Sequence, residues 1–213
     1  MHEKIFKIMK DRIVRLVKDN SADIYPEEID LEAEYAVSAE AVPFADRLKM
    51  KYRPVYIGEA WGKAWDSAWF HLTGRIPESF AGKEICLRLN VSGEILLYDA
   101  EGVPEYGLTG WSVFDHQFFK DRYILKDAKA GSRIDIWIEA AANSLLGINL
   151  PPRTERNPEE PMGSYSPQVK YLKLCVFDRE TWLFLLEMES LSGLLDCYNA
   201  DDYRARQLLH QKG

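Results

Sequence analysis

Apolar and polar residues alternate along this chain at two different periods. Over residues 3–19, apolar side chains recur every three or four positions with Lys and Arg between them, which is the period of a helix with one buried face. A leucine-rich run over 182–195 repeats this pattern. A shorter apolar run over 203–209 follows Asn199, which is a predicted helix cap. The pattern predicts helices at both ends. The apolar stripe of the first comprises Ile5, Met9, Ile13, Leu16 and Val17.

In the middle of the chain the period falls to two. Short runs of β-branched and aromatic residues are separated by turn signals, which is typical of antiparallel strands. In the run 133–140, three isoleucines share one face, and Asp135, Trp137 and Glu139 share the other. A tryptophan among charges indicates that this second face is partly covered, for example by a helix. The predicted strands are Val55–Ala60, Ser67–Arg75, Glu84–Val91, Glu94–Asp99, Arg122–Leu125, Arg133–Ala140 and Lys170–Phe177.

These segments predict a mainly β fold, a jelly roll or galactose-binding-like β-sandwich with flanking N- and C-terminal α-helices. Three regions follow. Residues 1–53 form a helix and, from residue 20, an arm over the surface, because their periodicity is weak after the helix. Residues 54–178 form the sandwich, and residues 179–213 form a helical linker toward a further domain.

Composition and charge exclude several classes of protein. The net charge of −7 argues against nucleic-acid binding, which depends on clustered Lys and Arg. No apolar run reaches the length of a membrane span, and the first residues lack the pattern of a secretion signal. The three widely spaced cysteines favour free thiols, and we expect Cys86 and Cys175 to be buried within strands. These observations predict a cytoplasmic protein.

Candidate chemistry is limited to the aromatic residues. The chain shows no zinc-ligand spacing, no nucleophile elbow and no phosphate-binding loop, so we assign no catalytic or metal-binding residue and expect no cofactor. Trp61 and Trp65 recur four residues apart, and Trp111 precedes Asp115 and His116 in an expected loop. Aromatic rings beside polar groups form ligand pockets, which makes these five residues candidates for carbohydrate binding. Ordinary core packing is the stronger explanation for Trp61 and Trp65, and solvation is the stronger one for Asp115. For Trp111, packing against another domain is an equally good explanation.

Several segments, in this order, resemble the family-38 glycoside hydrolases of the cytosolic and vacuolar α-mannosidase type. They are Gly58–Gly62, Trp69–Pro77, Phe80–Leu87, Gly93–Asp99 and Ile136–Asn143. The resemblance implies the N-terminal domain of such an enzyme, whose zinc-binding catalytic domain lies elsewhere in the parent chain. Its partners would be that catalytic domain, further copies of the chain and a mannoside. The family often has Arg or Lys after the Trp-Phe pair, where this chain has His71.

The residues and the resemblance leave three functions open. In the favoured one, the sandwich is a non-catalytic module that packs against the catalytic domain, shapes its active site and supports oligomer contacts. In the second, it is a carbohydrate-binding module with an aromatic stacking site, or the front jelly roll of a β-galactosidase-type glycosidase. In the third, it is a small enzyme with an unrecognised site. An exposed concave site lined by the candidate tryptophans would favour the second, and a deep pocket of clustered carboxylates or histidines the third.

Overall fold

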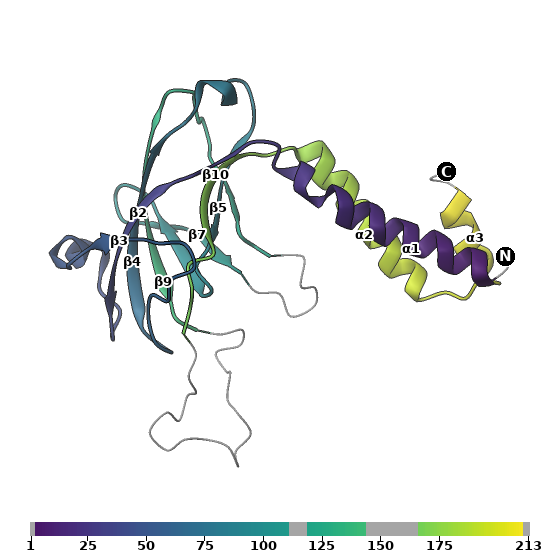
Figure 1. Cartoon of the computed structure of the whole chain (residues 1–213), viewed down its shortest axis with the longest axis horizontal. Coiled ribbons are helices and arrows are strands. Elements are labelled where there is room, and N and C mark those ends of the chain that lie inside the picture. Colours follow the sequence, from purple (N-terminus) through teal and green to yellow (C-terminus); the bar gives the residue numbers. More distant parts are fainter. Residues whose placement is uncertain (1–2, 111–118, 144–165, 211–213) are drawn as a thin grey trace, which may run out of the picture. The chain divides into compact units, whose positions relative to one another are not determined.

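The computed structural model describes residues 3–110, 119–143 and 166–210, shown as coloured ribbons in Figure 1. The chain forms two compact units. One is helical and comprises Met1–Glu27 and Phe177–Gly213. The other, Glu28–Val176, is a β-sandwich.

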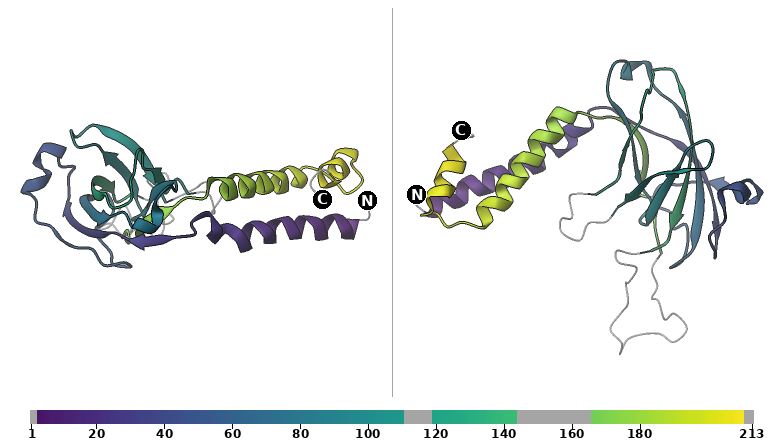
Figure 2. Two further views of the ribbon diagram at one scale, coloured as in Figure 1. Left: turned by 90° about the horizontal axis from the view of Figure 1, so that it is seen from above. Right: turned by 180° about the vertical axis from the view of Figure 1, so that it is seen from behind.

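The helical unit is built on two long helices, α1 (Glu3–Asn20) and α2 (Arg179–Asp196), which lie side by side (Figure 2). A short helix, α3 (Tyr203–His210), follows, and a 3₁₀ turn, η1 (Ser21–Ile24), comes after α1. The side chain of Asp178 accepts a hydrogen bond of 2.9 Å from the backbone N–H of Thr181. This cap starts α2 and lowers the pKa of Asp178.

The buried stripe of α1 differs in part from the predicted one. Phe6 and Val17 are buried, and Met9 and Ile13 pack against the hydrophobic cluster that contains Phe6. Ile5 and Leu16, by contrast, are exposed. The predicted helices are confirmed, but α3 begins at Tyr203 rather than directly after Asn199, where the chain makes a turn closed by the Asp202 N–H and the Asn199 carbonyl.

The sandwich consists of two antiparallel sheets, which confirms the predicted fold class. One sheet has four strands in the order β1-β10-β5-β8, and the other has six in the order β3-β2-β4-β9-β6-β7. The four-stranded sheet comprises β1 (Glu28–Asp30), β5 (Ile85–Asn90), β8 (Arg122–Ile124) and β10 (Tyr171–Val176). The six-stranded sheet comprises β2 (Glu32–Ser38), β3 (Arg53–Pro54), β4 (Ser67–Arg75), β6 (Glu94–Tyr98), β7 (Pro104–Thr109) and β9 (Arg133–Ala141).

The core lies between the facing sides of the two sheets. Alternate residues of every long strand point inward, and many of them, such as Phe70, Leu87, Ile138 and Leu174, are fully buried. Each such side chain contributes roughly 1.5–3 kcal/mol by leaving water. Cys86 and Cys175 are buried, as predicted.

The prediction of a surface arm over residues 20–53 is wrong in part. Within residues 20–53, β1 and β2 are sheet strands, and β2 pairs with β4 over its whole length. The polar residues Glu32 and Glu34, followed by Tyr35, could have indicated a strand, but the small side chains of the neighbouring alanines weakened the alternation. Only the segment between β2 and β3, with the 3₁₀ helix η2 (Phe44–Lys49), lies over a sheet face.

One predicted strand does not form, and one strand of the structure was not predicted. Residues 55–60 form no strand, because the chain turns there: the Glu59 N–H bonds the Tyr56 carbonyl, and Gly58 has a φ of 88°. Residues 104–109, in contrast, form the edge strand β7, although Gly107 reads as a turn residue. Pro104 is its first residue, a position where the missing N–H costs no ladder hydrogen bond.

Candidate functional site

The outer face of the six-stranded sheet divides into two halves of different composition. Register pairs align its outward side chains in rows across the strands. The closed half comprises Trp69, His71, Tyr98 and Trp137. The open half comprises Ser67, Glu94, Leu96, Gly107, Thr109, Glu139 and Ala141. One half therefore carries large rings, and the other mostly small or polar side chains.

The segment between β2 and β3 covers the closed half. Phe44 stacks on Tyr98, with ring centres 5.4 Å apart, and meets Trp69 edge-on at 5.7 Å. The Trp69 indole donates a hydrogen bond of 2.8 Å to the Val42 carbonyl and is 1% exposed. The Arg47 guanidinium lies 3.5 Å from the Phe44 ring centre and covers Trp137 at 4.6 Å. The predicted cover over Trp137 is thus confirmed, although a 3₁₀ helix and its flanks provide it.

His71 belongs to this closed half. Its ring stacks on Trp137, with centres 4.1 Å apart and an angle of 5° between planes. Its two ring nitrogens face carboxylates on neighbouring strands, Glu34 at 3.3 Å and Asp135 at 2.9 Å. The contacts of the imidazole that the structure describes are therefore made with residues of the same sheet, on its outer face.

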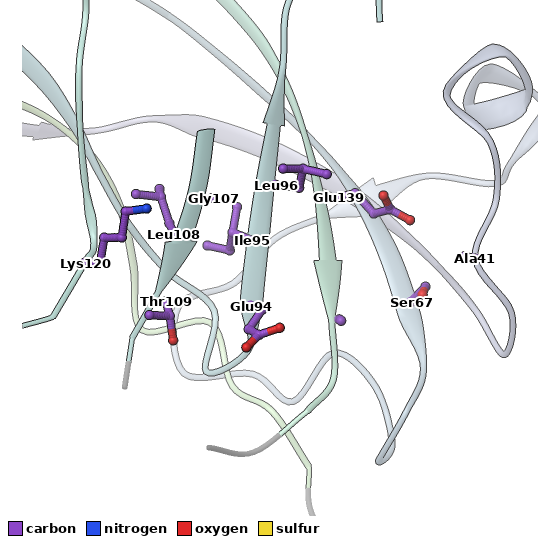
Figure 3. A pocket seen from close by; sticks show the side chains of 11 residues that line it. Ala41, Ser67, Glu94, Ile95, Leu96, Gly107, Leu108, Thr109, Lys120 and Glu139 are labelled. Carbon is purple, nitrogen blue, oxygen red and sulfur yellow. The ribbon is translucent and has the colours of Figure 1, made fainter. Parts of the chain in front are cut away.

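The open half forms a hollow of about 610 Å³, which Ala41 and Lys120 bound at its two ends. Figure 3 shows Lys120 at one end, Ser67 and Ala41 at the other, and Glu94 and Glu139 between them. The outward side chains of Leu96 and Ala141, with Gly107, form its floor. Gly93 brings the start of β6 close to β9, since a Cβ there would lie 2.2 Å from the Ala141 carbonyl oxygen.

The charged side chains around the hollow differ in their burial and in their interaction partners. Glu139 is half-buried and accepts a hydrogen bond of 2.8 Å from the Tyr98 hydroxyl. Burial first, and then this hydrogen bond, raises the pKa of Tyr98 to about 12. Glu94 is exposed, and its backbone N–H donates to the Asn143 side chain at 3.1 Å. The Lys120 ammonium lies 4.3 Å from the Tyr106 ring centre. The hollow thus presents two carboxylates, one ammonium and the hydroxyls of Ser67 and Thr109.

Of the five predicted carbohydrate-binding residues, the structure describes Trp61 and Trp65, and it places one in the core and the other on the surface. Trp61 is 2% exposed, packs edge-on against Phe70 and donates a hydrogen bond of 2.7 Å to the Val91 carbonyl. Its ring belongs to the core, so it offers no face to a sugar; core packing is the correct explanation for it. Trp111, Asp115 and His116 lie outside the described residues.

Trp65 is the predicted site residue that lies on the surface. Its side chain is 49% exposed, and its backbone has a φ of 72°, which is rare for a residue with a large side chain. Its N–H donates to the Ala142 carbonyl at 2.8 Å, and the Ala142 N–H donates to the Asp66 carbonyl. These bonds hold Trp65 beside the ends of β4 and β9, next to two strands that line the hollow.

A second polar cluster is better explained as structural. Asp121 is buried and accepts hydrogen bonds from the Tyr171 hydroxyl at 2.6 Å and from Arg88 at 3.1 Å. Burial, and next the Asp121 charge, raises the pKa of Tyr171. The Arg88 guanidinium also lies 4.9 Å from the Tyr171 ring centre. A buried carboxylate with such partners is satisfied and fixes the packing of β5, β8 and β10.

The residues around the hollow were not predicted as a site. Sequence patterns place Glu139 and Trp137 on one strand face, but Glu94, Thr109 and Lys120 join them only through strand register. No group of three or more His, Cys, Asp or Glu side chains that could hold a metal occurs in residues 3–110, 119–143 and 166–210. Of the helices in these ranges, none has the length and apolar character that a membrane crossing requires.

Two antiparallel sheets packed face to face, with flanking helices, define the chain as a jelly roll β-sandwich protein. The family model described as "Alpha-mannosidase, jelly roll domain" matches residues 26–167. The chain therefore belongs to the α-mannosidase jelly roll domain family, as the motifs from Gly58 onward indicated.

Curated relatives agree with this assignment. The chain is 28% identical over 174 residues to human α-mannosidase 2C1, and 27% identical over 153 residues to α-mannosidase G of Dictyostelium discoideum. These alignments cover 82% and 68% of this chain, but only 16% and 13% of the relatives. The chain thus spans a small part of their length.

Solved structures give more distant matches. A β-glucuronidase from Ruminococcus gnavus matches with a TM-score of 0.46 and 12% identity, over 72% of this chain and 29% of its own. A β-glucuronidase from Faecalibacterium prausnitzii gives 0.39 and 9%, over 72% and 32%. Likenesses at this level add nothing to the family assignment.

Proposed function

We infer that this chain is the non-catalytic jelly roll domain of a longer α-mannosidase. In this role it packs against the catalytic domain of the same polypeptide, supports the shape of the active site and contributes to contacts between subunits. The family match over residues 26–167 carries the proposal. The described residues offer no metal-ligand cluster for the zinc that the family resemblance implies, so we place zinc and bond cleavage in the catalytic domain and derive no catalytic step here.

Exposed apolar side chains on the helical unit support a packing role. Leu183, Phe184 and Leu194 of α2 are 45%, 48% and 42% exposed, and Ile5 and Val14 of α1 are similarly uncovered. Helices of a globular protein normally turn such residues inward, so apolar positions on both long helices fit a surface that another part of the protein covers.

Location in the cytoplasm is part of the same proposal. It rests on the three cysteines, whose odd number and wide spacing do not suit a disulfide framework. It also rests on the burial of Cys86 and Cys175 as thiols within neighbouring strands, an arrangement compatible with a reducing compartment.

The test uses the full-length protein. We expect Leu183→Asp combined with Phe184→Asp to lower turnover of an aryl α-mannoside and to change the assembly state measured by light scattering, because the charges oppose burial of α2. Tyr203→Asp, at another exposed position of the helical unit, is the matched control and should leave both unchanged. Full activity and assembly of the double variant would contradict the packing role. Turnover by residues 1–213 alone, with added zinc, would contradict the non-catalytic role.

A further inference from the structure

We propose that the hollow in the open half binds a neutral, hydroxyl-rich ligand, the pyranose rings of a short α-mannoside. The choice of mannose among sugars rests on the proposed function, whereas the site does not depend on packing against a catalytic domain.

The size and floor of the hollow suit a small saccharide. Its volume of about 610 Å³ lies within the range of roughly 300–1,000 Å³ that small-molecule sites occupy. The floor consists of Leu96, Gly107 and Ala141, of which two have little or no side chain. A sugar ring can therefore lie against the sheet with its C–H face on these residues.

The groups around this floor match the hydrogen-bonding needs of sugar hydroxyls. Carboxylates accept hydrogen bonds from hydroxyls more strongly than neutral groups do, and Glu94 and Glu139 lie on adjacent strands, offset along them by one row. The Tyr98 hydroxyl bonds one oxygen of Glu139 at 2.8 Å, which fixes the orientation of that carboxylate. Lys120 and Ser67 supply donors at the edges.

The charge balance separates a neutral ligand from charged ones. Two carboxylates and one ammonium give the hollow a net negative charge, which repels phosphates and uronic acids. Lys120 at one end opposes an extended diamine, whose charges would otherwise suit two carboxylates. A neutral, hydroxyl-rich ligand is repelled neither by the two carboxylates nor by the Lys120 ammonium.

The site also lies apart from the covered aromatic surface. Phe44 and Arg47 fill the space above the rings of the closed half, whereas only Ala41 of this segment reaches the hollow. The hollow is therefore left accessible by the same segment that closes the adjacent half.

Titration of the 213-residue chain with α-mannobiose, followed by ¹H–¹⁵N NMR, tests the proposal. We expect saturable shifts of the backbone amides of Leu96, Gly107 and Ala141, with a Kd of about 1 mM, the strength of an open site with few partners. Glucuronic acid and a linear diamine at the same concentrations should not shift these amides.

Two variants locate the site, each with a matched control. Glu94→Gln keeps the shape but weakens the acceptor, and we expect the Kd to rise about tenfold. Glu32→Gln, an exposed carboxylate on β2 outside the hollow, should leave it unchanged. Ala141→Arg fills the hollow and should abolish binding, while Ala81→Arg, in an exposed turn, should not. The melting temperature of each variant verifies that it is folded.

Each outcome decides the proposal. Shifts at the three floor amides that Glu94→Gln and Ala141→Arg reduce would support it. No shifts at about 10 mM mannobiose, shifts confined to other amides, or preferential binding of glucuronic acid or the diamine would overturn it. None of these results depends on turnover by the full-length protein, so failure of the site and failure of the packing role are distinguishable.

Discussion

The closed and open halves of one sheet face show how side-chain size decides which surface a chain covers with its own residues. Both halves draw side chains from β4, β6 and β9, and the open half also includes residues of β7. In the closed half, Trp69, Tyr98 and Trp137 present broad apolar faces, and covering them with Phe44 and Arg47 removes much apolar area from water. In the open half, alanine, glycine and serine offer little area to bury. The covering segment therefore stops at the border, and a hollow remains.

The largest expected difference between the halves is in stability. We predict that Trp69→Ala lowers the free energy of unfolding by about 3–5 kcal/mol, because it leaves a cavity and removes the hydrogen bond to Val42. Trp65→Ala is the matched control: its ring is half exposed, and we expect a change within about 0.5 kcal/mol. Urea unfolding measures both. Equal effects of the two substitutions would show that the cover contributes nothing.

A glycine pair tests how closely the covering segment approaches the sheet. Gly102 has a φ of 84°, and a Cβ there would lie 2.4 Å from the Phe44 ring. Gly82 has a φ of 72° but nothing within 4 Å of the added Cβ. Both alanine variants carry the backbone strain, but only Gly102→Ala displaces Phe44. We expect Gly102→Ala to lower the free energy of unfolding by about 1–3 kcal/mol more than Gly82→Ala does. Equal losses of stability in the two variants would contradict the close contact between Phe44 and Gly102.

The smallest expected effect is on pH dependence. The pKa of Tyr98 is raised to about 12 from the ordinary value of 10, chiefly by burial. Between these values the folded state holds the proton that the unfolded chain releases, so stability is retained below pH 10 and falls as pH rises toward 12. Tyr98→Phe should make this fall shallower. Because Tyr52 behaves in the same way, part of the fall should persist. An unchanged slope in urea midpoints at pH 9 and 11 would contradict the assignment.

Particular residues show how far the sequence predicts the fold and where it fails. The nine-residue run Ser67–Arg75 carries strong alternation, and its predicted bounds agree with β4. β2 was missed because alanines at positions 33 and 36 weaken the contrast between its faces, and β7 because a proline and a glycine lie in a short edge strand. Trp61 and Trp65 look alike in sequence, yet one is in the core and the other on the surface. Local spacing carries no information about which ring the opposite sheet will cover.

By itself, the sequence determined the helices at both ends, the antiparallel sandwich and the family, because periodicity, turn residues and ordered motifs are local properties of the chain. The hollow was decided only by the tertiary structure. Glu94, Thr109, Glu139 and Lys120 come together because strand register aligns β6, β7 and β9, and register follows from the packing of both sheets across the core. Within the described residues, the segment between β2 and β3 leaves the open half uncovered for a tertiary reason as well, since Phe44 and Arg47 of this segment pack where the sheet presents rings.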